Sequence, residues 1–261
     1  MYMDDYKRWL EASLEDPALT AELQQIEGQE DEIKERFAVA LKFGTAGLRG
    51  VLGAGTNRMN IYVVRQATQG LANWVKTQGG NQLVAVSYDS RINSDVFAKE
   101  TARVLAANGI KVRIYDALMP VPALSFATRY YGANAGVMVT ASHNPAKYNG
   151  YKAYGPDGCQ MTDDAAAVVY AEIQNTDILT GAKLISFEDG MAQGLIEYVG
   201  EDIGGLDFSI DNSGGIVSHL AAVGAIGLVA VVLGGVVGSG DHDTGVGTVE
   251  TGSEGQCGNG H

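Results

Sequence analysis

Between residues 60 and 175, apolar segments typical of strands alternate with amphipathic segments typical of helices. This alternation predicts an α/β fold, in which helices pack on the faces of a sheet. Asn60 stands at the N-cap position of the first helical segment, and we expect Ser94 to cap the second, which Gly109 ends. The predicted strands are 83–89, 110–116, 135–142 and 150–154, and the predicted helices are 60–80, 93–109, 122–133 and 162–175.

Three parts of different composition follow one another along the chain. Residues 1–40 form an N-terminal helical extension, in which we expect short charged helices over 4–14, 18–27 and 29–41. Residues 41–203 carry the strand–helix alternation and are expected to form one domain. Residues 204–261 form an atypical tail rich in Gly and Val.

The tail differs sharply from the rest of the chain, since no Lys or Arg follows Lys183. Within it, residues 216–237 are free of charge and long enough to span a bilayer, yet no basic residues flank them. Three interpretations stay open: a membrane anchor, a degenerate start of a second domain, or a sequence whose reading frame is lost near residues 204–215. A membrane association is the least favoured of these. If the tail is genuine, we expect residues 238–261 to be disordered.

The charge balance restricts the partners of the chain. Its 261 residues carry a formal net charge of −13, which argues against a general nucleic-acid binder but leaves room for a small anionic substrate in a basic pocket. The two cysteines, Cys159 and Cys257, form no CxxC pair, and the charged N-terminus has no apolar signal-peptide core. A cytoplasmic location is therefore expected. The oligomeric state cannot be inferred from the sequence.

A cluster of functional residue types follows the apolar run 135–139. The segment TASHNPAKYNGYK, residues 140–152, contains Ser142 at the predicted carboxyl end of a strand, where ligands bind in α/β sheets. Ser, Asn and Pro also form turns, so a purely structural turn is the alternative. A serine hydrolase is disfavoured, because no GxSxG motif is present.

Two other segments are specialised as well. FGTAGLRGVLGAG, residues 43–55, combines five glycines with Arg49, which predicts close backbone approach to a phosphate. It matches neither a P-loop nor a dinucleotide-binding loop, and a glycine-rich hairpin with a surface arginine is the alternative. YDSR, residues 88–91, places Asp89 and Arg91 at a strand end, where they could brace a loop or touch a ligand.

These segments together carry a resemblance. FGTAGLRG, YDSR, TASHNP and YNGYK occur in the order found in the first domain of the α-D-phosphohexomutases, and the chain from residue 1 to about 202 resembles the branch of bacterial phosphoglucomutases and phosphopentomutases. LIEYVGEDI resembles the segment that leads into the second domain of that family. The resemblance implies a mixed, mostly parallel sheet flanked by helices over residues 41–203.

The resemblance also implies roles for individual residues. Ser142 matches the serine that carries a phosphoryl group, Lys152 a lysine of proton transfer, and Arg49 an arginine that stabilises charge. The other matched positions shape or support the substrate and phosphate loop: Thr45, His143, Asn144, Asp89 and Arg91.

The implied activity is that of a phosphoglucomutase, which interconverts glucose 1-phosphate and glucose 6-phosphate through glucose 1,6-bisphosphate. Mg²⁺ is the implied cofactor, held by the phosphate on Ser142 together with aspartates of a DGDADR loop that this sequence lacks. GDHDTG, residues 240–245, does not replace that loop. The alternatives are a catalytically incomplete phosphosugar-binding fragment, or a phosphomannomutase or phosphopentomutase.

Overall fold

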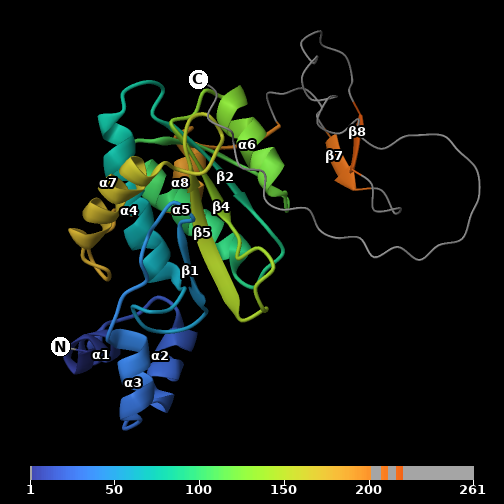
Figure 1. Cartoon of the computed structure of the whole chain (residues 1–261). Helices are drawn as coiled ribbons and strands as arrows, with labels where there is room; N and C mark the ends of the chain where they lie inside the picture. The colour runs from blue at the N-terminus through green and yellow to red at the C-terminus, as the bar shows by residue number, and fades with distance from the viewer. Residues whose placement is uncertain (1, 201–206, 211–215, 220–261) are drawn as a thin grey trace, which may run out of the picture. The chain divides into compact units, whose positions relative to one another are not determined.

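The computed structural model describes residues 2–200, 207–210 and 216–219 (Figure 1). Its contacts divide the chain into a unit of residues 1–199 and a second unit of residues 200–261. The first unit contains the N-terminal helices, the sheet and the helices that cover it. The two units are described separately below.

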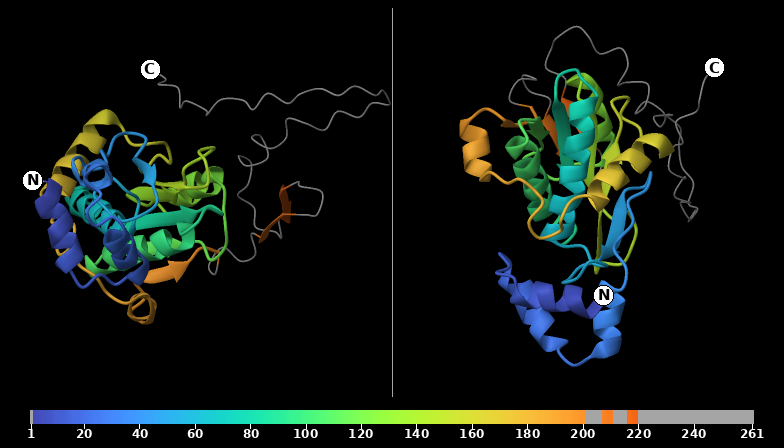
Figure 2. Two further views of the ribbon diagram at one scale, coloured as in Figure 1. Left: turned by 90° about the horizontal axis from the view of Figure 1, so that it is seen from below. Right: turned by 90° about the vertical axis from the view of Figure 1, so that its left-hand side faces the viewer.

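The expected N-terminal helical extension is confirmed. It consists of α1 (Tyr2–Glu11), α2 (Pro17–Gln25) and α3 (Glu30–Phe37). Asp16 caps α2 by accepting a hydrogen bond from the Ala18 amide, and a proline occupies the first helical position. Buried Trp9 packs edge-to-face against Phe37 within the extension and against Tyr62 of the sheet-bearing part. Figures 1 and 2 show the three helices gathered at one end of this unit.

The core of the first unit is a six-stranded mixed sheet, as the resemblance implied. Its order is β1-β5-β4-β2-β3-β6. The pairs β4–β2, β2–β3 and β3–β6 are parallel, whereas β5 pairs antiparallel with both β1 and β4. The strands are β1 (Leu48–Val51), β2 (Leu83–Tyr88), β3 (Lys111–Ile114), β4 (Ala135–Val139), β5 (Tyr148–Tyr154) and β6 (Ile196–Tyr198).

Helices cover both faces of this sheet (Figure 1). On one face, α6 (Val121–Tyr130) packs on a cluster that includes Ala85 and Met138. On the other face, the larger core joins Val84 and Val86 to α4 (Ile61–Thr77), α5 (Ser94–Ala107) and α7 (Asp163–Gln174). Strands buried on both faces lack a polar side, which explains why β2 and β4 read as continuous apolar runs.

Several details of the sequence-based prediction were wrong. β1 lies inside the glycine-rich segment 43–55, where no strand was predicted. β6 and α8 (Phe187–Ala192) were not predicted either. Ser94 is the first residue of α5 and not its cap, because Asn93 occupies the cap position with a left-handed φ of 64°.

In the second unit, β7 (Asp207–Ile210) pairs antiparallel with β8 (Ile216–His219). β8 occupies the start of the segment 216–237, which was long enough to span a bilayer. The remainder of that segment, and the expected disorder of residues 238–261, lie outside the described residues. Within the described ranges, no helix has the length and apolar character needed to cross a membrane.

Candidate functional site

The serine-bearing loop begins where β4 ends at Val139. Ser142 is exposed and adopts a φ of 53°, in the left-handed region that residues other than glycine rarely occupy. Its amide donates a hydrogen bond of 2.9 Å to the hydroxyl oxygen of Thr140. Its own hydroxyl oxygen lies 3.3 Å from Nδ1 of His143, which is also exposed. The chain therefore presents the Ser142 hydroxyl to solvent on a strained turn.

Arg91 holds this loop through its backbone. Its guanidinium donates to four carbonyl oxygens: Nη1 contacts those of Pro145 and Tyr148 at 3.2 and 3.1 Å, and Nη2 contacts those of Asn144 and Ser142. Hydrogen bonds from a charged donor are stronger than neutral ones. Arg91 thus contacts the loop through its backbone carbonyls and leaves the Ser142 side chain free of contact with its guanidinium in these hydrogen bonds.

Asp89 in turn orients Arg91. One carboxylate oxygen accepts hydrogen bonds from the Arg91 amide and the Ser94 hydroxyl, at 3.0 and 2.8 Å. The other oxygen lies 3.6 Å from Nε of Arg91. Since both oxygens face these partners, Asp89 belongs to the frame of the loop.

Arg49 approaches the loop from the neighbouring strand. It lies on β1 opposite Gly150 of β5, and its Nη1 donates to the side-chain oxygen of Asn144 at 2.9 Å. Its side chain is exposed. This bond uses one of the five N–H groups of the guanidinium, so the others suit an anion at the loop.

Lys152 lies on β5, the strand that directly follows the serine loop. It pairs with Met138 of β4, and only 5% of its surface is exposed. Cross-strand partners share a face of the sheet, so Lys152 lies on the same face as Met138, the face covered by α6. A buried lysine is uncommon in proteins, which makes Lys152 the most unusual cation among the described residues of the site.

Thr45 sits in a tight turn that rests against β5. The backbones of Gly44 and Gly47 exchange hydrogen bonds across this turn, and Gly47 has a φ of 76°. A Cβ atom at Gly47 would lie 1.9 Å from the carbonyl oxygen of Tyr151 and 2.7 Å from Cα of Lys152. The glycine therefore allows the half-buried Thr45 turn to lie directly beside the lysine.

Sequence reasoning missed Asn149. This fully buried residue donates to the carbonyl oxygen of Ile92 and to the Ser94 hydroxyl, at 2.9 and 3.0 Å, and accepts from the Gly150 amide. It joins the Arg91 segment to β5. An asparagine within a strand is unusual, and this was the available signal.

Tyr151 is a second ionisable group that is fully buried on β5. Burial raises its pKa well above its ordinary value, and the opposing hydrogen bond from the Thr68 hydroxyl does not reverse the shift. Tyr151 is therefore a neutral core residue and not a candidate for proton transfer.

Metal ligands are scarce in the part of the chain that the structure describes. No group of three or more His, Cys, Asp or Glu side chains there could hold a metal ion. The carboxylate of Asp89 already contacts Arg91 and Ser94. The described side chains therefore do not form a magnesium site by themselves.

Comparisons with known proteins place the site within a family. Residues 40–179 match the alpha/beta/alpha domain I of the phosphoglucomutase/phosphomannomutase family. A phosphoglucomutase of Staphylococcus haemolyticus is 42% identical over 142 residues, which cover 54% of this chain and 26% of that protein. One of Staphylococcus saprophyticus is 36% identical over 174 residues, covering 67% and 32%.

Among solved structures, a putative phosphomannomutase from Thermus thermophilus is 30% identical, with a TM-score of 0.49 over 59% of this chain and 35% of the other. The chain spans about a quarter to a third of the length of the curated relatives above.

Proposed function

Because the chain belongs to the phosphoglucomutase/phosphomannomutase family and contains its domain I, we propose that it is the serine-bearing part of a phosphoglucomutase. The enzyme would interconvert glucose 1-phosphate and glucose 6-phosphate. One observation supports this most strongly. Ser142 stands exposed on a loop whose Ser142 and Asn144 carbonyls accept hydrogen bonds from Arg91, while Arg49 donates to the side chain of Asn144 in the same loop.

The proposed reaction uses Ser142 as a phosphoryl carrier. The sugar hydroxyl attacks phosphorus, a new P–O bond forms, and the bond to the Ser142 oxygen breaks. The resulting glucose 1,6-bisphosphate turns round and returns its other phosphoryl group to Ser142 as the reverse process. A serine phosphate carries about −1.5 to −2 charges near pH 7, which Arg49 is positioned to offset.

Proton transfer is assigned to Lys152. Each attacking hydroxyl must lose a proton, which the Lys152 amine would accept and later return to the departing oxygen. Lys152 suits this role because it lies next to the Thr45 turn, on the strand β5 that directly follows the serine loop. Thr45, His143 and Asn144 would then shape the phosphate site, and Asp89 with Arg91 would keep its backbone in place.

Mg²⁺ is the cofactor suggested by the family resemblance, and it would neutralise the serine phosphate. The described residues supply no ligand set for it. No step above depends on the metal, and its remaining ligands would have to come from outside the described residues. We further propose that the enzyme acts in the cytoplasm on a small sugar phosphate and does not bind nucleic acid, given its net charge of −13.

A second candidate function is a fragment that binds sugar phosphate without turnover. It is favoured by the described residues, which include no group of three or more His, Cys, Asp or Glu side chains that could hold a metal ion. Mannose and pentose phosphates remain alternative substrates, because the roles assigned above concern the phosphoryl group and the proton, which all these substrates share.

The test separates the phosphoryl carrier from complete turnover. The 261-residue chain would be incubated with ³²P-labelled glucose 1,6-bisphosphate and Mg²⁺, and the labelled residue located by mass spectrometry. We expect label on Ser142, none in Ser142→Ala, and normal labelling in the control Ser90→Ala, which alters an exposed serine of the Asp89 loop.

A coupled assay on glucose 1-phosphate then distinguishes the two functions. Labelling with turnover supports the enzyme, and labelling without turnover supports the fragment. Label on another residue, or equal label in Ser142→Ala, refutes both.

A further inference from the structure

The second half of the glycine-rich segment has two sets of neighbours, because Leu52 contacts the serine loop whereas two of the glycines do not. Gly53 and Gly55 follow β1 and contact the N-terminal extension instead. A Cβ at Gly53 would lie 2.7 Å from the carboxylate of Glu22, and one at Gly55 would lie 2.8 Å from the carbonyl oxygen of Arg36. Both glycines have positive φ. These two glycines therefore allow the loop after β1 to lie close to α2 and α3.

Glu22 and Arg36 form the core of this contact. The two carboxylate oxygens of Glu22 accept from Nη1 of Arg36 at 2.5 Å and from the buried Ala54 amide at 2.7 Å. The same Nη1 donates to the Ala54 carbonyl, and the Arg36 carbonyl accepts from the Asn57 amide. Charge-assisted bonds thus fix the loop after β1 to α2 and α3.

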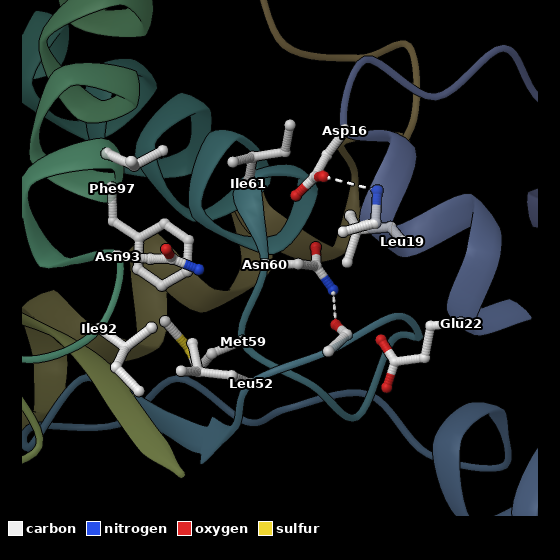
Figure 3. Close-up of a pocket in the computed structure, with 13 residues that line it drawn as sticks. Asp16, Leu19, Glu22, Leu52, Met59, Asn60, Ile61, Ile92, Asn93 and Phe97 are labelled. Carbon is white, nitrogen blue, oxygen red and sulfur yellow. Dashed lines mark hydrogen bonds between the residues drawn. The ribbon is translucent and has the colours of Figure 1, made fainter. Parts of the chain in front are cut away.

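Apolar side chains do not completely fill the space beside these hydrogen bonds. A cavity of about 310 Å³ lies between α2 and the loop, as Figure 3 shows, with Glu22 at its edge. Its lining includes Leu19 of the extension, Leu52 and Met59 of the loop, and Phe97 of α5. Beside this cavity, the hydrogen bonds of Glu22 and Arg36 join α2 and α3 to the loop, in addition to the buried packing of Trp9 on Tyr62.

The loop after β1 also contacts the candidate site. Its ends are joined by hydrogen bonds between Met59 and Val51 and between Gly53 and Met59, and the Leu52 amide donates to the Lys147 carbonyl of the serine loop at 2.8 Å. β1 begins four residues before Leu52 and carries Arg49, whose guanidinium contacts Asn144. A displacement of the loop would move β1 along its pairing with β5.

From these contacts we infer that Glu22 is a positioning residue for Arg49, and that the N-terminal extension thereby sets the phosphate-binding geometry of the serine loop. This inference rests on the proposed function only for the identity of the ligand. The mechanical coupling between Glu22 and Arg49 is independent of it.

Two variants test the inference, and each replaces a glutamate that accepts a hydrogen bond from Arg36. Glu22→Gln removes the charge that joins Arg36 to the Ala54 amide. Glu32→Gln is the control, because Glu32 accepts from Nε of Arg36 at 2.8 Å but contacts the loop after β1 only through a longer ion pair of 3.9 Å with Arg58. The readouts are the Arg49 Nε–H resonance in NMR spectra of the whole chain, and the affinity for glucose 1-phosphate.

We expect Glu22→Gln to shift the Arg49 resonance and to weaken glucose 1-phosphate binding about three- to tenfold, the factor associated with one hydrogen bond. Glu32→Gln should change neither. Glu22→Asp, which keeps the charge but shortens the side chain, should give an intermediate shift. An unchanged Arg49 resonance in folded Glu22→Gln, or equal shifts in both glutamine variants, would overturn the inference.

Hydrogen exchange of the unmutated chain covers the case in which the variants do not fold. The Ala54 and Leu52 amides should exchange through the same opening event as the amides of α2. Faster, independent exchange of Ala54 would refute the coupling. If the native chain binds no glucose 1-phosphate while Arg49 still responds to Glu22→Gln, the proposed function fails and the coupling stands.

Discussion

Arg49 and Asn144 lie 95 residues apart in the chain, and their side chains are joined by a hydrogen bond of 2.9 Å. This bond connects β1, at the edge of the sheet, with the loop that presents Ser142. Arg91 contacts the same loop through the Ser142 and Asn144 carbonyls. The serine loop is thus held by two arginines from different elements, one on its side chain and one on its backbone.

Replacing Arg91 should loosen the serine loop. Arg91→Ala removes the donor to four carbonyl oxygens, so we expect the free energy of unfolding to fall by about 2–3 kcal/mol. Arg91→Lys should recover only part, because an ammonium lacks the planar fork. Urea denaturation measures the loss, and hydrogen exchange should locate it at residues 142–150. The control is Arg129→Ala, which alters an exposed arginine bonded to its own helix.

Substitutions at Ser142 should separate stability from chemistry. Glycine accepts the φ of 53° without steric cost, whereas alanine does not. We expect Ser142→Gly to raise the free energy of unfolding by up to about 1 kcal/mol and Ser142→Ala to leave it nearly unchanged. Both variants should lose phosphorylation at this position. Retained phosphorylation in either would contradict the assignment of the carrier.

The parts of the site that could be predicted from sequence are local. Ser142 follows an apolar run directly, so its place at a strand end could be predicted, and Lys152 fell on the next predicted strand. β1 could not, because its four residues LRGV contain a glycine and an arginine and become a strand only through pairing with β5.

Long-range contacts could not be predicted from the sequence either. The contact of Arg91 with the Ser142 carbonyl spans 51 residues, and no spacing rule predicts it. Gly53 and Gly55 have the composition of a phosphate loop, yet their neighbours are Glu22 and Arg36 of the extension. A glycine's role depends on which backbone or side chain comes close, and that is a property of the fold.

The turn that carries Thr45 should tolerate no side chain at Gly47. Alanine there would suffer both from the positive φ and from its Cβ lying 1.9 Å from the Tyr151 carbonyl. Gly79→Ala is the matched control, since its φ is 66° but no atom lies within 4 Å of the new Cβ. We expect a loss of about 1 kcal/mol for Gly79→Ala and of about 3 kcal/mol or more for Gly47→Ala, measured by urea denaturation.

Acid should detach the N-terminal extension. Hydrogen bonds from Arg8 and Arg65 lower the pKa of Asp177 and Glu15 below their ordinary values of 3.8 and 4.5. Both ion pairs join the extension to the rest of the unit. Because the pKa of each carboxylate is lower in the folded protein, each ion pair contributes its full stabilisation above the ordinary pKa of that carboxylate. The contribution is lost as the pH falls from the ordinary pKa through the lower pKa of the folded protein.

The fluorescence of Trp9, which lies in the interface with Tyr62, should report this transition below about pH 4. Asp177→Asn should make the transition shallower at low salt, and its difference in stability from the native chain should shrink steadily as the pH falls below 3.8. An acid profile identical to that of the native chain would show that the Arg8–Asp177 pair contributes nothing, as partly exposed pairs sometimes do.

Lys152 should be needed for chemistry and dispensable for binding. Lys152→Met keeps an unbranched side chain of similar length in a position that is only 5% exposed, so we expect the fold to be retained. Without the amine, the transfer of the phosphoryl group from Ser142 to glucose 1-phosphate should slow by about 10²- to 10⁴-fold, the range of general acid–base catalysis. Single-turnover measurements with ³²P-labelled enzyme give this rate directly.

Lys147→Met provides the comparison for Lys152. Lys147 is an exposed lysine of the serine loop, with its Nζ 5.7 Å from the centre of the Tyr148 ring. Removing its charge should leave the transfer rate within about twofold, since an exposed ammonium is screened by water. If instead Lys147→Met slows transfer and Lys152→Met does not, the proton acceptor lies in the loop and the role assigned to β5 is wrong.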